Sequence, residues 1–426
     1  MLLVGGGGRE DAICRALTRS GSEVFSVSKN QNPSIMRLSK EHVTSEETDY
    51  EKILKFAVER HLDLAIIGPD PVLNTPLADR LWQSGIPVAS PSLSAARIET
   101  SKEYMRNLLQ RHSIRGNLFN RTFTNMEELE KFISSYSEPF VVKPIGLTGG
   151  KGVRVMGDHF STPAEGLRYA ADVLRSDGRV LIEEKIRGEE FSLQAFTDGD
   201  HVAPMPLAQD YKRAYDGDIG PNTGGMGSIT DSDHSLPFIR SPTLETARSI
   251  VSDVVRSMKS EGNLFRGIMY AQFMQTSTGP RIIEINARFA DPEGINVLTT
   301  LNDNFTEILF RITDGTLPQF VDFRDVATTL KYIVPVGYGS KPEPEKLTIE
   351  EIRDPRVRIY YASVSGTMDS VMMSSSRALA VIAESDTISH ASELVEQNLS
   401  HIRGRYYVRH DIGSEEMIRK KIMGAP

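Results

Sequence analysis

The sequence predicts a multidomain protein of mixed α/β and α+β class, and two observations support this prediction. The first is length, because the chain has 426 residues and a single hydrophobic core stops growing at roughly 250–300 residues. The second is a change of pattern, because residues 1–95 alternate short apolar strands with helical patterns, whereas later residues are rich in strands and glycine. Alternation of the first kind builds a doubly wound parallel sheet. We therefore expect an N-terminal parallel-sheet domain, a larger central region and a small C-terminal domain.

The N-terminal region contains its expected elements in regular order. Short apolar runs predict strands, and apolar residues at helical spacing, as at positions 12, 13, 16 and 17, predict helices. Gly85 follows the third helical pattern as a stop signal. The expected strands cover 1–4, 23–28, 64–67 and 87–89, and the expected helices cover 9–20, 50–61 and 76–84.

The rest of the chain divides into two further regions. Residues 90–114 have a helical pattern, and 115–325 contain strand-rich stretches together with the glycine clusters. Residues 326–426 open with the apolar strand ATTLKYIVPV and end with a helix near 388–402. Because no repeat or long linker separates the regions, we expect closely packed domains with sites in the clefts between them. The expected domains are 1–95, 96–325 and 326–426.

Composition excludes several classes of protein. The net charge of −8 argues against a general nucleic-acid binder, which would carry an excess of Lys and Arg. The single cysteine, Cys14, excludes an intrachain disulfide and has the pattern of a buried helix face. No apolar run reaches the roughly 18 residues of a membrane span, and the start MLLVGGGG is too short for a signal peptide. A cytoplasmic enzyme fits these features.

The first stretch with chemical content is VGGGGRE, at 4–10. Glycines between a strand and a helix let the backbone approach a ligand closely, and free N–H groups at a helix start attract anions. Arg9 could add a charged fork to a phosphate. The stretch is not G-x-G-x-x-G, and no acidic residue at the right distance marks a ribose site. We expect a phosphate-bearing substrate here, the alternative being a tight strand–helix turn without a ligand.

The second stretch is VVKPIGLTGGKGVRV, at 141–155. A strand delivers Lys143, and a glycine loop then brings Lys151. Two lysines that flank such a loop suit a polyphosphate, because the loop can close over it while the ammonium groups neutralise it. No G-K-[ST] opens a helix, so this is not a Walker A pattern. The alternative is a hairpin with two solvated lysines.

The third stretch, VLIEEKIRGEEFS at 180–192, takes an apolar strand into an acidic linker. Backbone groups of such a linker can read an adenine edge, and a carboxylate can accept from ribose hydroxyls. By itself the pattern also fits an exposed acidic turn. The acidic residues are Glu183, Glu184, Glu189 and Glu190.

The fourth stretch, AQDYKRAYDGDIGPNTGGMGS at 208–228, combines charge and glycine without an apolar period. Such density cannot form a core element. Long functional loops have this composition, so we expect a loop that orders over substrates rather than a disordered surface loop. Its polar residues are Asp210, Lys212, Arg213, Asp216, Asp218, Asn222 and Thr223.

The fifth stretch is YAQFMQTSTGPRIIEINARFADPEG, at 270–294. Two apolar strands join through TSTGP, and Glu284 and Asn286 alternate with isoleucines, so both project from one strand face. Two oxygen ligands on one face suit Mg²⁺, and Gln272 on the partner strand could supply a third. Arg288 continues this face and could stabilise a transferring phosphoryl group or hold a carboxylate. The alternative is a polar strand face exposed to water.

Together these stretches resemble the ATP-grasp superfamily and, within it, the glycinamide ribonucleotide synthetase family. The resemblance covers nearly the whole chain and includes VGGGGRE, IIGPD, SPSLSAARIETSK, KPIGLTGGKGV, EEKIRGEEFS, EINARFADPE and RYYVRHDIG. Its most specific part is QDYKRAYDGDIGPNTGGMG, which separates this family from other ATP-grasp ligases. The resemblance implies an N-terminal substrate domain, a two-part ATP-grasp region with a lid at about 115–185, and a small C-terminal domain.

The resemblance also implies roles for matching residues. ATP phosphates would contact Lys102 and Lys143 and lie under the loop Gly149, Gly150, Lys151 and Gly152; adenine and ribose would meet Glu183, the backbone at Glu184 and Ile186, and Glu190. The metal would be bound by Glu284 and Asn286 with Gln272, which stands where many ATP-grasp enzymes have a carboxylate. The glycine and phosphoribosylamine pocket would contain Asp210, Lys212, Asp218 and Arg288 with Asn222, Thr223 and Gly224, and Gly7, Gly8, Arg9 and Glu10 would face phosphoribosylamine.

The implied reaction joins glycine to 5-phosphoribosylamine with ATP, giving glycinamide ribonucleotide, ADP and phosphate in de novo purine synthesis. A glycyl phosphate would be the intermediate, and the cofactors would be ATP with Mg²⁺ or Mn²⁺. The expected partners are these small molecules, and we expect no nucleic acid or membrane partner. The sequence does not fix the oligomeric state, and a monomer is compatible with it. Asp11 departs from the family pattern, which usually has His there.

Three other functions are compatible with part of the sequence. Another ATP-grasp carboxylate–amine ligase would share the glycine loop and the metal strand but not the loop at 208–228. A nucleotide-binding regulatory module would bind ATP without turnover, against which the lysines and metal ligands argue. A dinucleotide-dependent oxidoreductase built on the N-terminal glycines would explain nothing beyond residue 90.

Overall fold

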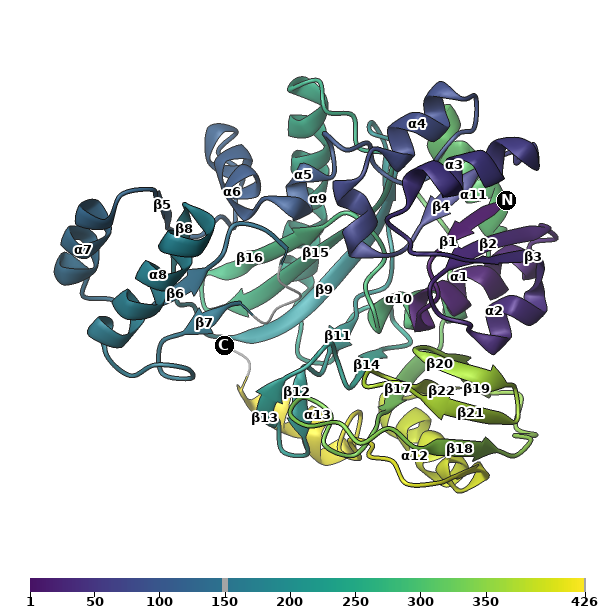
Figure 1. Cartoon of the computed structure of the whole chain (residues 1–426). Helices are drawn as coiled ribbons and strands as arrows, with labels where there is room; N and C mark the ends of the chain where they lie inside the picture. The colour runs from purple at the N-terminus through teal and green to yellow at the C-terminus, as the bar shows by residue number, and fades with distance from the viewer. Residues whose placement is uncertain (148–151, 425–426) are drawn as a thin grey trace.

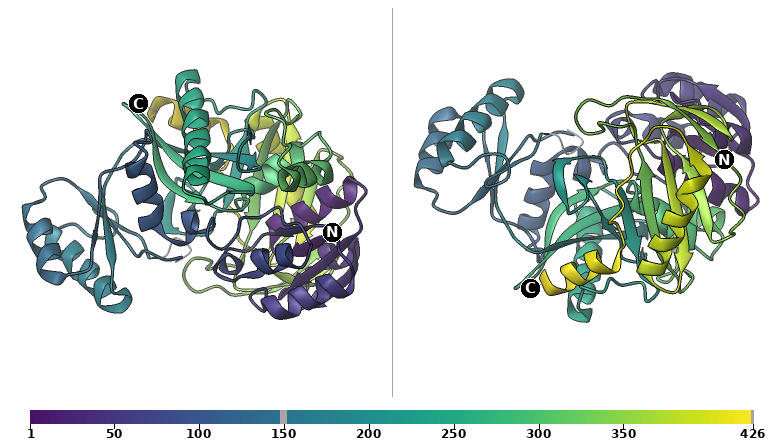
Figure 2. Two further views of the ribbon diagram at one scale, coloured as in Figure 1. Left: turned by 90° about the horizontal axis from the view of Figure 1, so that it is seen from above. Right: turned by 90° about the horizontal axis from the view of Figure 1, so that it is seen from below.

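The computed structural model describes residues 1–147 and 152–424. Figure 1 shows a parallel-sheet domain at the N-terminus, a small sheet with two helices that projects to one side, and a body of antiparallel sheets. Figure 2 shows that only a few segments connect the projecting part to the body. One continuous hydrophobic core joins the N-terminal domain to the body, whereas the projecting part has a core of its own. The predicted multidomain α/β and α+β class is confirmed, while the exact domain limits stay predictions.

The N-terminal sheet has the strand order β3-β2-β1-β4, and all of its pairs are parallel. Every residue of β1 and β4 is buried, as expected for strands covered by helices on both faces. The predicted doubly wound sheet is therefore confirmed. Two elements of this domain, α2 and β3, were not expected. The edge strand β3 was missed because it reads SKEHVT and has no apolar run. The elements are β1 (Leu2–Val4), α1 (Gly8–Arg19), β2 (Val24–Ser28), α2 (Pro33–Leu38), β3 (Ser39–Thr44), α3 (Tyr50–Glu59), β4 (Ala65–Ile67) and α4 (Leu77–Gln83).

The projecting part is a four-stranded antiparallel sheet of order β5-β8-β6-β7, which we call the lid sheet. Its core consists of aromatic and aliphatic side chains such as Phe123, Phe140 and Ile182. Thr162 begins α8 with a capping box, and Gly178 ends it in the left-handed conformation. The elements are β5 (Asn120–Phe123), α7 (Met126–Ser135), β6 (Phe140–Lys143), β7 (Arg154–Val155), α8 (Pro163–Asp177) and β8 (Val180–Glu184).

The body begins with an antiparallel sheet of order β10-β9-β15-β16. The helical stretch expected at 90–114 is interrupted at Ser101, which caps the second helix by accepting from the Tyr104 N–H. The elements are α5 (Arg97–Thr100), α6 (Lys102–Arg111), β9 (Glu189–Thr197), β10 (Val202–Pro204), α9 (Ser241–Ser260), β15 (Gly267–Thr276) and β16 (Gly279–Asn286).

A second body sheet has the order β11-β14-β17-β22-β19, and a smaller one has the order β20-β21-β18-β23. The stretch predicted as a loop at 208–228 instead supplies β11, the hairpin β12–β13 and the buried strand β14, which pairs with the apolar β17. Its small residues Gly227 and Ser228 fit a core strand despite their low hydrophobicity. The elements are β11 (Gln209–Asp210), β12 (Arg213–Tyr215), β13 (Ile219–Asn222), β14 (Gly227–Thr230), α10 (Glu293–Thr300), α11 (Phe305–Asp314), β17 (Ala327–Ile333), β18 (Lys346–Ile349), β19 (Val357–Tyr361), β20 (Val364–Thr367), β21 (Ser370–Met373), β22 (Leu379–Ser385), α12 (Ile388–Asn398), β23 (Ile402–Arg403) and α13 (Glu415–Gly424). The chain thus has one more helix, α13, beyond the helix expected near 388–402.

The N-terminal domain is joined to β19 by the buried carboxylate of Asp11. This carboxylate accepts from Arg15 at 3.0 Å, from the Ser34 hydroxyl at 2.6 Å and from the Tyr361 N–H at 2.8 Å. Asn32 adds a bond to the Tyr361 carbonyl at 2.7 Å. The departure from the family pattern at position 11 is therefore a contact between domains. Within 1–147 and 152–424, no helix is both long and apolar enough to cross a bilayer.

Candidate active site

The site is built on the hairpin β15–β16, where three predicted ligands lie together. Gln272 and Glu284 are cross-strand partners, and the Asn286 amide donates to the Glu284 carboxylate at 3.2 Å. This confirms that Glu284 and Asn286 share a strand face. The Gln272 amide nitrogen donates to Glu190 at 2.5 Å, and its oxygen accepts no hydrogen bond from the described parts of the chain, 1–147 and 152–424.

Three lysines from separate segments lie near enough to Glu284 to act on its charge: Lys102 begins α6, Lys143 ends β6, and Lys212 lies between β11 and β12. Burial works to raise the pKa of the Glu284 carboxyl, but Lys212, the Asn286 hydrogen bond, Lys143 and Lys102 together hold this pKa below its ordinary value. The carboxylate is therefore ionised at neutral pH. Burial also lowers the pKa of Lys102, whose ammonium donates to the Gly146 carbonyl at 2.7 Å.

The oxygens on this hairpin fit a hard divalent cation. Such ions take carboxylate and amide oxygens, and the set here consists of one ionised carboxylate, Glu284, and two amides. In the part of the chain that the structure describes, no group of three or more His, Cys, Asp and Glu side chains is arranged around a metal position. A cation here would therefore depend on Glu284 for its protein charge, with phosphate oxygens completing the shell.

Glu183 lies at the root of the lid sheet and is fully engaged by cations. Its carboxylate accepts from Lys143 at 2.7 Å and from Arg106 at 2.6 Å. Burial alone would raise the pKa of Glu183, but Arg106 and Lys143 lower it to about 2. The side chain thus holds the predicted phosphate lysine in place, and a contact with adenine would have to come from the backbone.

The linker between β8 and β9 is held by hydrogen bonds at Glu184 and by close packing at Gly188. The Glu184 carboxylate accepts from Arg281 at 2.6 Å and from the Phe119 N–H at 2.8 Å. Gly188 must be glycine, because a Cβ there would lie 1.8 Å from the Gln275 carbonyl oxygen. Ile186 lies between these two anchors, so the backbone that we expect to meet adenine is held at each end.

Asp210 and Lys212 come from the fourth predicted stretch, and Lys212 is linked to the hairpin. The Lys212 ammonium contacts Glu190 at 3.1 Å, and Glu190 in turn accepts from Gln272, the cross-strand partner of Glu284. Burial, with repulsion from Glu293, holds the pKa of the Asp210 carboxyl well above its ordinary value, although Lys212 opposes this shift. The Asp210 Oδ1 atom is buried without a hydrogen-bond partner among the described residues. It is therefore an acceptor that a ligand could satisfy.

Arg288 belongs to a chain of alternating charges that crosses from the N-terminal domain to β16. Its guanidinium contacts Asp70 at 2.7 Å and Glu99 at 3.0 Å, and Asp70 also faces Arg9 at 3.6 Å. Arg9 in turn contacts Glu10 at 2.6 Å. Asp70 and Glu99 were not identified as site residues from the sequence, although both stand in the quoted motifs IIGPD and RIETSK.

The N-terminal glycines have a packing role that the sequence did not reveal. Glu10 accepts from the Gly7 N–H at 2.8 Å and so caps α1 from within. A Cβ on Gly8 would lie 2.4 Å from the Tyr332 hydroxyl of β17. At Gly8, the absence of a side chain therefore permits close approach of the body, in addition to any ligand.

Part of the predicted substrate loop lies away from this group. Asp218 is exposed on the turn of the β12–β13 hairpin and pairs with Arg409 at 2.9 Å, and Asn222 is exposed on β13. Across 1–147 and 152–424, no hydrogen bond or ion pair joins either residue to the residues around Glu284. Thr223 binds the Lys212 carbonyl at 2.9 Å, and the Gly224 carbonyl accepts from Arg377. The structure thus ties Thr223 to Lys212, whereas Gly224 and Asp218 have arginine partners in the C-terminal region, Arg377 and Arg409.

The glycine loop is only partly described. Gly149, Gly150 and Lys151 lie outside the described residues, and the Gly152 carbonyl accepts from the Tyr169 hydroxyl at 2.8 Å. The Lys185 ammonium, at the other side of the lid sheet, donates to the Met156 carbonyl at 2.6 Å. The segment that follows the loop is thus tied to α8 and to the linker.

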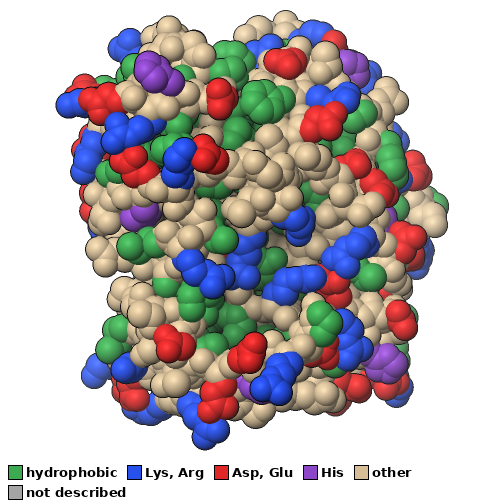
Figure 3. Space-filling model, turned by 90° about the vertical axis from the view of Figure 1, so that its right-hand side faces the viewer, with side chains coloured by type: hydrophobic (Ala, Val, Ile, Leu, Met, Phe, Trp, Pro, Cys, Tyr) green, Lys and Arg blue, Asp and Glu red, His purple; other side chains and the backbone are tan. Residues whose placement is uncertain are grey.

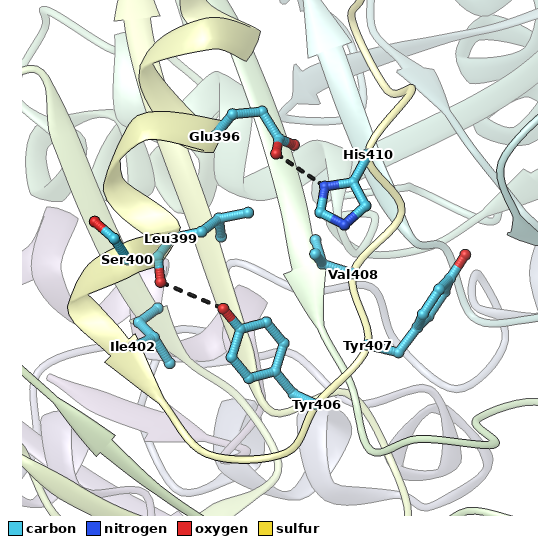
Figure 4. Close-up of a pocket in the computed structure, with 8 residues that line it drawn as sticks. All are labelled: Glu396, Leu399, Ser400, Ile402, Tyr406, Tyr407, Val408 and His410. Atoms are coloured by element: carbon cyan, nitrogen blue, oxygen red, sulfur yellow. Dashed lines mark hydrogen bonds and ion pairs between the residues drawn. The ribbon is translucent and has the colours of Figure 1, made fainter.

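A separate hollow lies in the C-terminal region and contains none of the predicted site residues. It has a volume of about 420 Å³, and Figure 4 shows a hydrogen bond between Glu396 and His410 at its rim, 2.8 Å long. It is lined by Glu396, Leu399, Ser400, Ile402, Tyr406, Tyr407, Val408 and His410. The hollow is therefore separate from the predicted site around Glu284 and its neighbouring lysines.

A lid sheet that carries one predicted phosphate lysine, with a hairpin that carries a carboxylate and an amide, is the arrangement of ATP-grasp enzymes. Comparison with known proteins agrees with this class. Models of phosphoribosylglycinamide synthetase match in order its N domain at 1–99, its ATP-grasp (A) domain at 100–294 and its C domain at 328–415. The chain belongs to the phosphoribosylglycinamide synthetase family.

Individual relatives agree over the full length. A phosphoribosylamine–glycine ligase of Pyrococcus horikoshii is 43% identical over 425 residues, covering 99% of this chain and 96% of the relative. The crystal structure of phosphoribosylamine–glycine ligase from Thermotoga maritima matches with a TM-score of 0.82 and 26% identity, covering 96% of this chain and 99% of the other. A biotin carboxylase from Campylobacter jejuni shares the fold alone, with a TM-score of 0.74 and 14% identity over 99% of this chain and 96% of the other.

Proposed function

We propose that this chain is a phosphoribosylamine–glycine ligase, which joins glycine to 5-phosphoribosylamine and converts ATP to ADP and phosphate. The observation that carries the proposal is the placement of Lys102, Lys143 and Lys212 near the ionised Glu284, together with the buried Asp210 oxygen that has no hydrogen-bond partner among residues 1–147 and 152–424. Family membership and the names of full-length relatives support the same reaction.

Lys102, Lys143 and the hairpin would bind ATP and its metal. Lys102 begins α6 and Lys143 ends β6, so the two approach the phosphates from the body and from the lid sheet. Glu284 and Asn286, with Gln272, would hold Mg²⁺ or Mn²⁺ in an all-oxygen set. A divalent cation held there would neutralise charge on the phosphate oxygens.

The reaction is a phosphoryl transfer followed by an acyl transfer. The glycine carboxylate would attack the γ-phosphoryl of ATP, releasing ADP and forming glycyl phosphate. The amine of phosphoribosylamine would then attack the acyl carbon, lose a proton and release phosphate. Positioning and charge neutralisation supply most of the rate in such transfers, and here Lys143 and Lys212 provide the charge.

The substrate groups have separate contacts in this arrangement. Asp210 Oδ1 would accept a hydrogen bond from an amine, which satisfies the buried atom that now lacks a partner. Arg288, held by Asp70 and Glu99, would face a carboxylate or a transferring phosphoryl group. On the face of the molecule drawn in Figure 3, Lys and Arg side chains gather in a furrow between the N-terminal domain and the C-terminal sheets.

ADP release with each substrate in turn tests the proposal. We expect ADP formation with glycine and phosphoribosylamine together, and a collapse of the rate when either is omitted. A panel of other amino acids and amines should give far less ADP. Equal ADP release with an unrelated acid and amine would contradict the proposal and favour another ATP-grasp carboxylate–amine ligase.

A further inference from the structure

Arg106 is a buried arginine that no sequence motif identified, and it stands one turn from a proposed phosphate lysine. It lies on α6 four residues after Lys102, so both side chains leave the same face of the helix. Its side chain is 0% exposed. A guanidinium so far from water is stable only when its charge and all its N–H groups find partners.

All five N–H groups of Arg106 are satisfied. The Nε atom donates to Glu183 Oε1 at 2.6 Å and Nη2 donates to Glu183 Oε2 at 3.1 Å, which makes a two-point contact. Nη2 also donates to the Ile283 carbonyl at 2.9 Å, and Nη1 donates to the Ile282 carbonyl at 3.0 Å. The fifth N–H donates to the Asn117 side-chain oxygen at 3.3 Å. Only the planar fork of arginine can serve these acceptors together.

The partners of Arg106 lead to both halves of the proposed ATP site. Through Glu183, whose Oε2 atom also accepts from Lys143 at 2.7 Å, it reaches the lysine that ends β6. Through the two carbonyls it holds β16 immediately before Glu284. The second carbonyl is available because the β15–β16 pairing shifts register between Gln272 and Phe273, which leaves Ile283 without a partner in the ladder.

We propose that Arg106 is a positioning residue that sets the distance between the phosphate lysine of the lid sheet and the metal-binding end of β16. Glu183 transmits its effect to Lys143, and the carbonyls of Ile282 and Ile283 transmit it to Glu284. Without Arg106, the Glu183 charge would fall on Lys143 alone and draw that ammonium away from phosphate. The bulge at Ile283 would lose the donor that fixes it.

This proposal rests on the proposed function in one respect: it takes Lys143 as a ligand of the nucleotide phosphates and Glu284 as a ligand of the metal. The test therefore measures nucleotide binding separately from turnover. Arg106→Lys keeps the charge and removes the fork. Arg324→Lys is the matched control, because Arg324 also makes a two-point contact with a glutamate, Glu384, and donates to a carbonyl, but in the joint between α10 and β22.

Calorimetry with ADP and Mg²⁺ should show binding to Arg106→Lys weakened roughly 10–100-fold, the usual effect of removing a residue that supports metal ligands. Arg324→Lys should bind as the unsubstituted protein does. In steady-state assays, Arg106→Lys should raise the KM for ATP and the Mg²⁺ needed for half-maximal activity, while the KM for glycine stays within about twofold. A purely structural role would not separate the two KM values.

A folded Arg106→Lys variant with unchanged nucleotide affinity would overturn the proposal, as would equal changes in both KM values. Glu183→Gln provides a second route if Arg106→Lys does not fold, because it removes the link to Lys143 while keeping the side-chain volume. Unchanged nucleotide affinity in Glu183→Gln would likewise refute transmission through Glu183. If the unsubstituted protein binds Mg²⁺ and ADP but makes no product from glycine and phosphoribosylamine, the proposed function fails while the binding test of Arg106 stands.

Discussion

Replacing Glu284 by Gln removes the one full negative charge among the proposed metal ligands. The glutamine keeps the size of the side chain and one oxygen, so the change isolates charge. The variant should stay folded because each neighbouring lysine keeps another partner: Lys143 has Glu183, Lys212 has Glu190, and Lys102 has the Gly146 carbonyl. Any loss of activity would therefore report on the reaction.

The expected loss can be worked from this geometry. Stabilisation of a transferring phosphoryl group by a bound metal contributes several kcal/mol. Gln272 and Asn286 are neutral, so without Glu284 most of that contribution should disappear. A loss of about 4 kcal/mol corresponds to a roughly 10³-fold lower kcat, since about 1.4 kcal/mol is tenfold.

The assay is ADP release at saturating ATP, glycine and phosphoribosylamine, repeated over a range of Mg²⁺ concentrations. Glu307→Gln on the exposed face of α11 is the matched control and should retain full activity. A kcat for Glu284→Gln within tenfold of the control at every Mg²⁺ concentration would refute the metal assignment.

Three further predictions concern other parts of the molecule. Asp210→Asn and Lys212→Met should each raise the KM for glycine or phosphoribosylamine at least tenfold while ADP binding, measured by calorimetry, changes little; an equal loss of ADP binding would contradict the separation of sites. Asp11→Ala should lower the free energy of unfolding by about 3–5 kcal/mol, because Arg15 would be left without its carboxylate, and denaturant titration showing less than about 1 kcal/mol would count against this contact between domains. Glu183, with a folded pKa of about 2 against an ordinary 4.5, should contribute its full stabilisation above about pH 4.5 and lose it as pH falls toward 2; unfolding titrations between pH 3 and 6 should therefore show a shallower pH dependence in Glu183→Gln, and identical curves would contradict it.

The sequence by itself determined the parts of the site that follow local rules. Side chains alternate along a strand with a period of two, so Glu284 and Asn286 had to share a face wherever β16 lay. The run of strand, glycines and helix at the N-terminus required a parallel sheet with a sharp turn after β1. Lys143 ends the strand that was predicted to carry it, because the apolar run FVV before it is a local signal.

Composition alone did not predict the structure of the fourth stretch, residues 208–228. Its charge and glycine predicted a loop over the substrates, yet Gly227 and Ser228 lie in a buried strand against β17. Small residues were needed there because a Cβ on Gly227 would lie 2.1 Å from the Leu330 carbonyl oxygen. Asp218, on the same stretch, instead faces Arg409.

Only the tertiary structure decided which charges meet. Arg106 and Glu183 are 77 residues apart in the chain, and Arg288 and Asp70 are 218 apart. No periodicity links positions at such separations, because their contact depends on how helices and sheets pack. The cost of burying an unpaired charge then makes each pairing specific once packing has brought the residues together.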